Sequence, residues 1–270
     1  MLSNTGCAMA RQRRGAGVRL AGAAFAGGLV LALLSGEVPQ FVFGGSNPIR
    51  HAPLPQDARL PISLPYGANV VFEGDSNIAG SRVGGSAYAF PAIFRRETGS
   101  GFVVANIGVG GATADDWPEQ PREAAAMFVI MLGSNDAAPR GLLSRRKPVD
   151  LVRYEARLKA LATRRIASGA RVLLLAPPPA GSTAMDRRIH PYRLAAQRAA
   201  FEAGASFADP VEAFDREKEL VALQHDALHL SRAGHLLLGK WLASRIVLQP
   251  MTDVTLNEGT SDGRVSLVHS

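Results

Sequence analysis

The sequence is poor in cysteine and lacks two common zinc-binding motifs. Its 270 residues include a single cysteine, Cys7, so no intrachain disulfide can form. Neither a paired C-x-x-C motif nor an H-E-x-x-H motif occurs, which excludes those two metal frameworks. Cys7 also precedes the apolar N-terminal segment, so it cannot be a lipidated cysteine at the end of a signal sequence. The sequence therefore carries no redox evidence about the compartment.

Signatures of nucleic-acid binding are also missing. The net charge is +7, but no basic stripe interleaved with aromatic residues and no zinc-finger spacing accompanies it. The hydrophobic fraction of 47% and the charged fraction of 20% are typical of an ordinary globular protein. We therefore expect no nucleic-acid partner and interpret most of the charge as solvated helix faces.

Two glycine-rich stretches resemble phosphate-binding motifs without completing them. Residues 108–113 follow an apolar run but end in Thr113, and the acidic residue of the dinucleotide fingerprint is missing. Residues 234–241 have the spacing of a phosphate loop, yet they end in Trp241 and are typical of a helix interior. No G-x-S-x-G motif occurs, which argues against an ordinary α/β-hydrolase.

The first 36 residues have the pattern of an export segment. Arginines lie between residues 11 and 19, and an uncharged apolar run follows from Leu20 to Gly36. This pattern predicts an apolar helix at residues 1–36 that is a signal peptide or an N-terminal membrane anchor. A buried core helix is less favoured because nothing in the run marks a solvent face. We therefore expect an exported protein, periplasmic or in the cell envelope.

The remaining chain divides into three parts. Residues 37–68 are rich in proline and glycine and are interpreted as a linker. Residues 69–248 alternate apolar runs with amphipathic stretches, which predicts a parallel, doubly wound α/β sheet. Residues 249–270 form a polar C-terminal tail. The expected strands are 69–73, 102–107, 127–132, 171–176 and 205–208, and the expected helices are 87–98, 150–168, 192–203 and 231–247.

Small and polar residues follow the ends of the first three expected strands. Ser76 follows the first strand in a Gly-Asp-Ser turn, where it can be a nucleophile or a helix cap. Gly111 lies in the glycine-rich stretch after the second strand, which can expose backbone amides or simply form a tight turn. Asn135 follows the third strand, where it can donate to an oxyanion or cap a helix.

A fourth polar stretch precedes the last expected helix. Asp226 and His229 lie three residues apart there, and a carboxylate at this spacing can orient one imidazole nitrogen. The other nitrogen could then take a proton from a serine hydroxyl. Two surface polar residues beside a helix start are the alternative.

Together, the four stretches resemble the SGNH-hydrolase superfamily, also called the GDSL esterase/lipase family. The matching blocks are residues 74–76, 106–113, 133–136 and 226–229, in the family's order. The resemblance implies a flavodoxin-like, three-layer α/β/α sandwich with five parallel strands and no cofactor. Departures are modest: Asn77 stands where many members have Leu, and Ala112-Thr113 replaces a more frequent polar-Thr pair.

The resemblance also implies a role for each site residue. Ser76 would be the nucleophile, His229 the general base and Asp226 the acid that orients it. Gly111 and Asn135 would supply oxyanion donors beside the Ser76 amide. We expect a serine esterase acting on a small-molecule or glycan ester, with short acyl or acetyl groups favoured.

Two other functions stay open at this point. The same site could transfer or remove acyl groups on a cell-envelope polysaccharide. A non-catalytic glycan-binding module is a third hypothesis, and it predicts a missing catalytic residue. The acyl chain length, the alcohol and the oligomeric state do not follow from the sequence.

Overall fold

A parallel five-stranded sheet forms the centre of the computed structural model, which describes residues 53–55, 57, 59–138, 148–181, 183–214 and 228–250. The strands lie in the order β3-β2-β4-β5-β6, and every neighbouring pair is parallel. Numbered along the chain within this sheet, the order is 2-1-3-4-5, which is flavodoxin-like. Their bounds are β2 Ala68–Gly74, β3 Phe102–Asn106, β4 Met127–Met131, β5 Arg171–Leu175 and β6 Ser206–Ala208.

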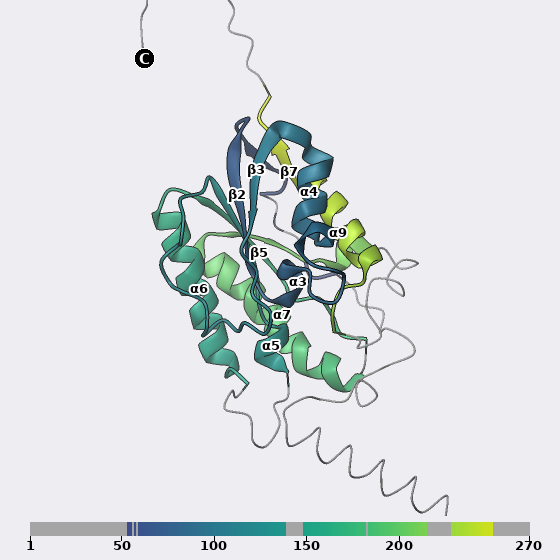
Figure 1. Cartoon of the computed structure of the whole chain (residues 1–270). Helices are drawn as coiled ribbons and strands as arrows, with labels where there is room; N and C mark the ends of the chain where they lie inside the picture. Colours follow the sequence, from purple (N-terminus) through teal and green to yellow (C-terminus); the bar gives the residue numbers. More distant parts are fainter. Residues whose placement is uncertain are drawn as a thin grey trace, which may run out of the picture.

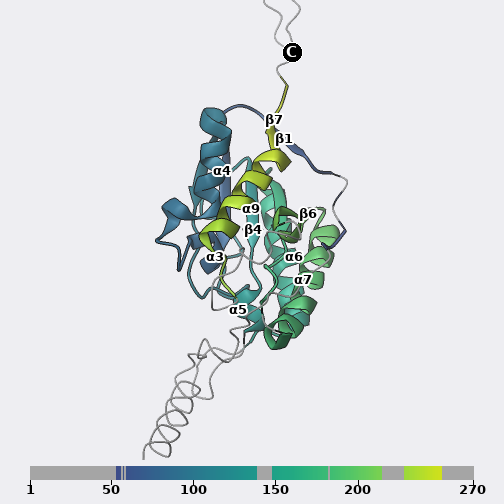
Figure 2. The same cartoon turned by 90° about the vertical axis from the view of Figure 1, so that its right-hand side faces the viewer.

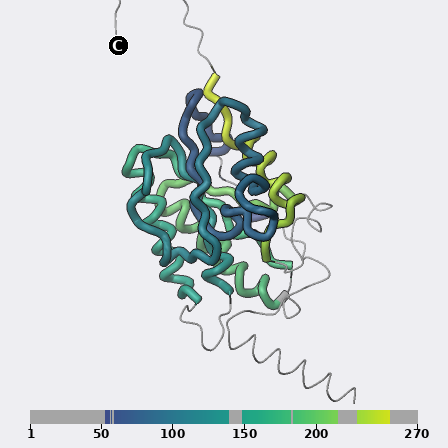
Figure 3. Tube along the Cα trace, in the orientation of Figure 1, coloured from purple at the N-terminus to yellow at the C-terminus, as the bar shows by residue number. Residues whose placement is uncertain are grey.

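Two layers of helices cover the sheet. α4 (Phe90–Thr98) and α9 (Arg232–Arg245) lie together on one side, and α6 (Leu151–Ala167) and α7 (Thr183–Ala203) lie together on the other (Figures 1 and 2). Figure 3 follows the same path as a single trace from β2 to the yellow α9. The expected α/β fold with a five-stranded parallel sheet is confirmed.

The buried residues of β4 show why the sheet needs both layers. Phe128 and Ile130 belong to the core cluster with α6 and α7, whereas Met127, Val129 and Met131 belong to the cluster with α4 and α9. Successive side chains of a strand point to opposite faces, so a strand that is apolar at every position must be covered twice. The continuous apolar run in the sequence therefore has its explanation in the three layers.

The predicted helix at 231–247 is wrong at its end, because Ile246–Leu248 form the strand β7. β7 pairs in parallel with β1 (Ile62–Leu64), which lies within the segment interpreted as a linker. The two strands lie side by side in Figure 2. β-Branched residues favour strands, and Ile62 and Ile246 are buried at 2% and 0% exposure.

Two predicted helix starts also differ from the structure. α7 begins nine residues before Tyr192 and continues through Pro191. α4 begins at Phe90, because the predicted first turn is a 3₁₀ helix, η1 (Ser86–Tyr88), and Pro91 fits the first turn of an α-helix. The short elements are α3 Ser76–Ala79, α5 Ser134–Ala137 and η2 Gly99–Gly101.

The predicted N-terminal apolar helix at residues 1–36 and the polar tail from residue 251 lie outside the described residues. Among the residues that are described, no helix is both long and apolar enough to cross a membrane.

The end of β2 packs unusually closely on β4. A Cβ added at Gly74 would lie 2.0 Å from the Met131 carbonyl oxygen, and Gly74 has a φ of 155°. The Asp75 amide donates to the same Met131 oxygen at 3.3 Å. Only glycine allows the two strand ends to approach in this way.

We predict that Gly74→Ala separates the ends of β2 and β4 and destabilises the fold. Gly67→Ala is the matched control, since its Cβ would meet nothing within 4 Å although its φ is 76°. The control should cost only about 1–2 kcal/mol from the left-handed backbone. Urea unfolding followed by circular dichroism measures both variants. A Gly74→Ala protein as stable as the control would contradict the prediction.

Candidate active site

Ser76 lies where β2 ends and α3 begins. Its Oγ is 2.9 Å from His229 Nε2, and the residue is 7% exposed. The helix cap is the preceding residue: the Asp75 side chain accepts a hydrogen bond from the Asn77 amide at 2.9 Å. The hydroxyl of Ser76 is therefore directed to an imidazole, and the helix-cap alternative for this serine is wrong.

His229 reaches Ser76 from a distant part of the chain. It lies just before α9, whose cap is Ser231, accepting from the Gly234 amide at 3.0 Å. The next residue, Leu230, donates its amide hydrogen to Asn77 Oδ1 at 2.9 Å. Asp226 lies outside the described residues, so its role as the orienting acid stays a prediction.

Gly111 lies in the loop that follows β3, with a φ of 76°. This loop is held against the end of β2, because the Val109 amide donates to the Gly74 carbonyl at 2.9 Å. The Ala112 amide donates in turn to the Val109 carbonyl at 3.1 Å. The loop that carries Gly111 is therefore hydrogen-bonded to the end of β2, two residues before Ser76.

Asn135 lies in α5, directly after β4. Its Nδ2 donates to the Ala112 carbonyl oxygen at 3.1 Å, which places the side-chain amide beside the Ala112–Thr113 peptide. A side-chain amide nitrogen carries two hydrogens, and the Ala112 carbonyl accepts one of them. Four of the five predicted site residues are thus described: Ser76, Gly111 and Asn135 follow the ends of neighbouring strands, and His229 contacts Ser76 from the segment before α9.

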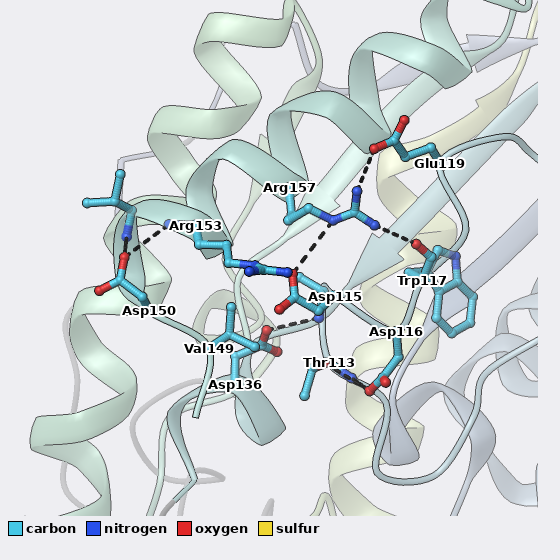
Figure 4. Close-up of polar contacts among 12 residues, drawn as sticks. Thr113, Asp115, Asp116, Trp117, Glu119, Asp136, Val149, Asp150, Arg153 and Arg157 are labelled. Carbon is cyan, nitrogen blue, oxygen red and sulfur yellow. Dashed lines mark hydrogen bonds and ion pairs between the residues drawn. The ribbon is translucent and has the colours of Figure 1, made fainter. Parts of the chain in front are cut away.

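Asp136 is a residue whose importance sequence reasoning missed. It is fully buried, and its Oδ1 accepts a hydrogen bond from the Ala114 amide at 2.9 Å (Figure 4). Burial, together with the nearby Asp75 carboxylate, raises the pKa of Asp136 to about 7, against the lowering effect of the Ala114 amide. Burial likewise raises the pKa of Asp75 to about 6, against the lowering effect of the Asn77 amide and of His229. In the sequence, the only indication that Asp136 matters was its position directly after Asn135.

The segment after Gly111 is held to α6 by arginines (Figure 4). Arg153 Nε donates to Asp115 at 2.8 Å, and Arg157 donates to Glu119 at 2.6 Å and to the Trp117 carbonyl at 2.9 Å. Trp117 is 2% exposed and belongs to the core cluster on the α6 side, so it does not line an open pocket.

The structure offers little for a metal. No group of three or more histidine, cysteine or acidic side chains with metal-binding geometry occurs in the described part of the chain. The chemistry that the described side chains can perform is proton transfer between an imidazole and a hydroxyl, beside amide donors.

Comparison with known proteins now identifies the family. The model of the GDSL-like lipase/acylhydrolase family matches residues 72–237, which run from the end of β2 into the first turns of α9. The chain belongs to this family. It is therefore a hydrolase, and the resemblance inferred from the four sequence blocks is confirmed. No curated protein matches the chain in sequence.

Several solved structures share the fold of this hydrolase. An acetylxylan esterase from Geobacillus stearothermophilus is 25% identical, with a TM-score of 0.56 over 66% of this chain and 94% of its own. A lipolytic protein of the G-D-S-L family from Desulfitobacterium hafniense DCB-2 is 22% identical, with a TM-score of 0.56 over 66% of this chain and 98% of its own. A lipase/acylhydrolase from Enterococcus faecalis is 22% identical, with a TM-score of 0.54 over 65% and 93% of the two chains.

We predict that Asp136→Asn changes the pH dependence of the hydrolase's stability. Because burial raises the pKa of Asp136 to about 7, the folded state holds a proton that the unfolded state loses above about pH 4. The wild-type contribution of this group to the free energy of unfolding therefore falls as pH rises from about 4 to 7.

The amide of the variant keeps an oxygen for the Ala114 N–H but does not titrate. Between pH 5 and pH 8, the free energy of unfolding of the wild type should therefore fall by on the order of 2 kcal/mol more than that of Asp136→Asn. Urea unfolding of both proteins at the two pH values measures the difference. An unchanged difference between pH 5 and pH 8 would show that Asp136 is already ionised at pH 5.

Proposed function

We propose that this hydrolase cleaves carboxylic esters through a serine acyl-enzyme, with short acyl or acetyl groups favoured. The observation that carries the proposal is the 2.9 Å contact between Ser76 Oγ and His229 Nε2. Serine is a weak nucleophile at its free pKa, and an imidazole within hydrogen-bonding distance supplies the base that it needs.

In the proposed acylation, His229 takes the Ser76 proton as Oγ attacks the ester carbonyl carbon. The tetrahedral oxyanion accepts hydrogen bonds from the Ser76 amide, the Gly111 amide and Asn135 Nδ2. His229 then protonates the leaving alcohol as the ester bond breaks. Asp226 is proposed to orient the imidazole throughout.

In deacylation, His229 takes a proton from water, whose oxygen attacks the acyl-enzyme carbonyl. Collapse of the second tetrahedral intermediate releases the acid and returns the proton to Ser76 Oγ. An alcohol in place of water would give transfer instead of hydrolysis, and the same residues would serve both reactions.

A second candidate substrate is an acylated cell-envelope polysaccharide, from which the enzyme would remove or to which it would transfer acetyl groups. The similarity to an acetylxylan esterase favours a glycan ester, and the arginine-flanked apolar segment at residues 11–36 favours export to the periplasm or envelope. A non-catalytic glycan-binding module is disfavoured by membership of a hydrolase family.

Ser76→Ala should lower kcat for p-nitrophenyl acetate at least about 10³-fold, because the attacking oxygen is gone. Ser100→Ala is a matched control, since the Ser100 hydroxyl accepts from Tyr66 Oη at 3.0 Å at the opposite end of the strands. The control should keep wild-type kcat. Hydrolysis by Ser76→Ala at the wild-type rate would refute the mechanism. Acetylated xylooligosaccharides, run beside the nitrophenyl ester, test the glycan substrate.

Asn135→Ala should lower kcat about 10²–10³-fold, because the side-chain amide stabilises the oxyanion chiefly in the transition state. KM should change little for the same reason. Steady-state kinetics on p-nitrophenyl acetate separate the two parameters. A rise in KM with unchanged kcat would instead make Asn135 a substrate-binding residue.

A further inference from the structure

Asn77 connects the two halves of the candidate site. It is the second residue of α3 and is 1% exposed. Its backbone amide donates to Asp75 Oδ1 at 2.9 Å, which completes the cap of α3. Its side-chain Oδ1 accepts a hydrogen bond from the Leu230 amide at 2.9 Å, across 153 residues of chain.

This hydrogen bond lies one residue along the chain from the contact between nucleophile and base. Ser76 and Asn77 are neighbours in the chain, and so are His229 and Leu230. The two pairs of neighbours therefore meet at two points, Oγ to Nε2 and Oδ1 to N–H, each at 2.9 Å. A backbone held at residue 230 restricts where the imidazole of residue 229 can lie.

We propose that Asn77 is a positioning residue that fixes His229 against Ser76 by accepting a hydrogen bond from the Leu230 amide. The inference rests on the proposed function, because it concerns the geometry of that proton transfer. Misplacement of a reacting group by about 1 Å can cost about 100-fold in rate. A backbone contact one residue from the base controls displacements of this size.

The amide nitrogen of Asn77 indicates that Oδ1 is the atom on which the side chain's role depends. Asn77 Nδ2 is buried and has no hydrogen-bond partner within the described chain. Burying an unpaired amide donor is unfavourable, so a purely apolar side chain would pack here at less cost. An apolar residue could not accept from Leu230, however. The side chain therefore carries an energetic penalty that only its oxygen offsets.

Nearby charge explains why the residue is an amide. Asp75 precedes it by two positions and is fully buried, with a pKa that burial raises to about 6. An aspartate at position 77 would offer the same oxygen but would add another buried carboxyl beside Asp75. Asparagine supplies the acceptor without a charge.

The test compares Asn77→Leu, Asn77→Ala and Asn77→Asp with the wild type. Leu and Ala remove the acceptor, and Ala does so without adding apolar volume in case the leucine variant does not fold. Both should lower kcat for p-nitrophenyl acetate at least about 10-fold, with KM within about 2-fold. Asn77→Asp keeps an oxygen at the same place but adds a buried carboxyl, so its kcat should lie between those of Asn77→Ala and the wild type.

A second readout avoids substrate binding altogether. The rate at which a fluorophosphonate labels Ser76 depends on the nucleophile and its base, so it should fall in parallel with kcat. Asn69→Ala is the matched control: Asn69 Nδ2 donates to the Ala124 carbonyl at 2.9 Å at the other end of β2, and Asn69 Oδ1 is also buried and unpaired within the described chain. The control should keep kcat and labelling rate, whatever its thermal stability.

The possible outcomes separate the two proposals. Ser76→Ala with wild-type activity overturns the proposed function and the role of Asn77 with it. An inactive Ser76→Ala together with folded Asn77→Leu or Asn77→Ala at wild-type kcat overturns the role of Asn77 alone. Equal losses in Asn77→Ala and Asn77→Asp also overturn it, because the acceptor oxygen would then not be what matters.

Discussion

The candidate site depends on the close approach of two strand ends at Gly74. Without a Cβ, this residue lets β2 lie against the Met131 carbonyl oxygen, which a Cβ would meet at 2.0 Å. The Gly74 carbonyl then accepts the Val109 amide at 2.9 Å, so the loop after β3 closes onto the same point. Strands β3, β2 and β4 are neighbours in the sheet, and Gly74 contacts both the end of β4 and the loop after β3. This is the switch point where ligands of such sheets bind.

A site built in this way buries polar groups that an ordinary core would exclude. Glu73, directly before Gly74, forms a bidentate pair with Arg165 of α6 at 3.0 and 3.1 Å, and both side chains are fully buried. Arg165 also donates to the carbonyls of Pro118 and Glu119, so the segment after Gly111 is held by the same guanidinium. Breaking a buried pair is strongly destabilising, although the pair itself adds little net stability. Its value here is that it fixes where β2, α6 and this segment lie relative to one another.

Sequence reasoning found the five strands because each is a short apolar run that ends in turn residues. It found Ser76 and Asn135 because parallel strands place their ends at one edge. It missed β1 because the segment around Ile62 is rich in proline, and because its partner Ile246 is 184 residues away in the chain. Such pairing carries no local periodicity. The burial of Asp136 escaped for a related reason, since an acidic residue in a polar block is usually solvated.

The position of the base shows most clearly what local sequence cannot specify. His229 precedes α9, and α9 packs closely on α4 at Gly239. A Cβ added at Gly239 would lie 2.6 Å from the Ile93 side chain, so only glycine allows this approach. His235, one turn into α9, accepts the Phe90 amide at Nδ1, at 3.2 Å. Burial lowers the pKa of His235 to about 4, so it stays neutral and keeps that lone pair at neutral pH. The distance from base to nucleophile therefore depends on the packing of α9 on α4 and on the hydrogen bond between Asn77 and the residue after His229. The four-residue motif predicted which residue is the base, but these distant contacts determine where it lies.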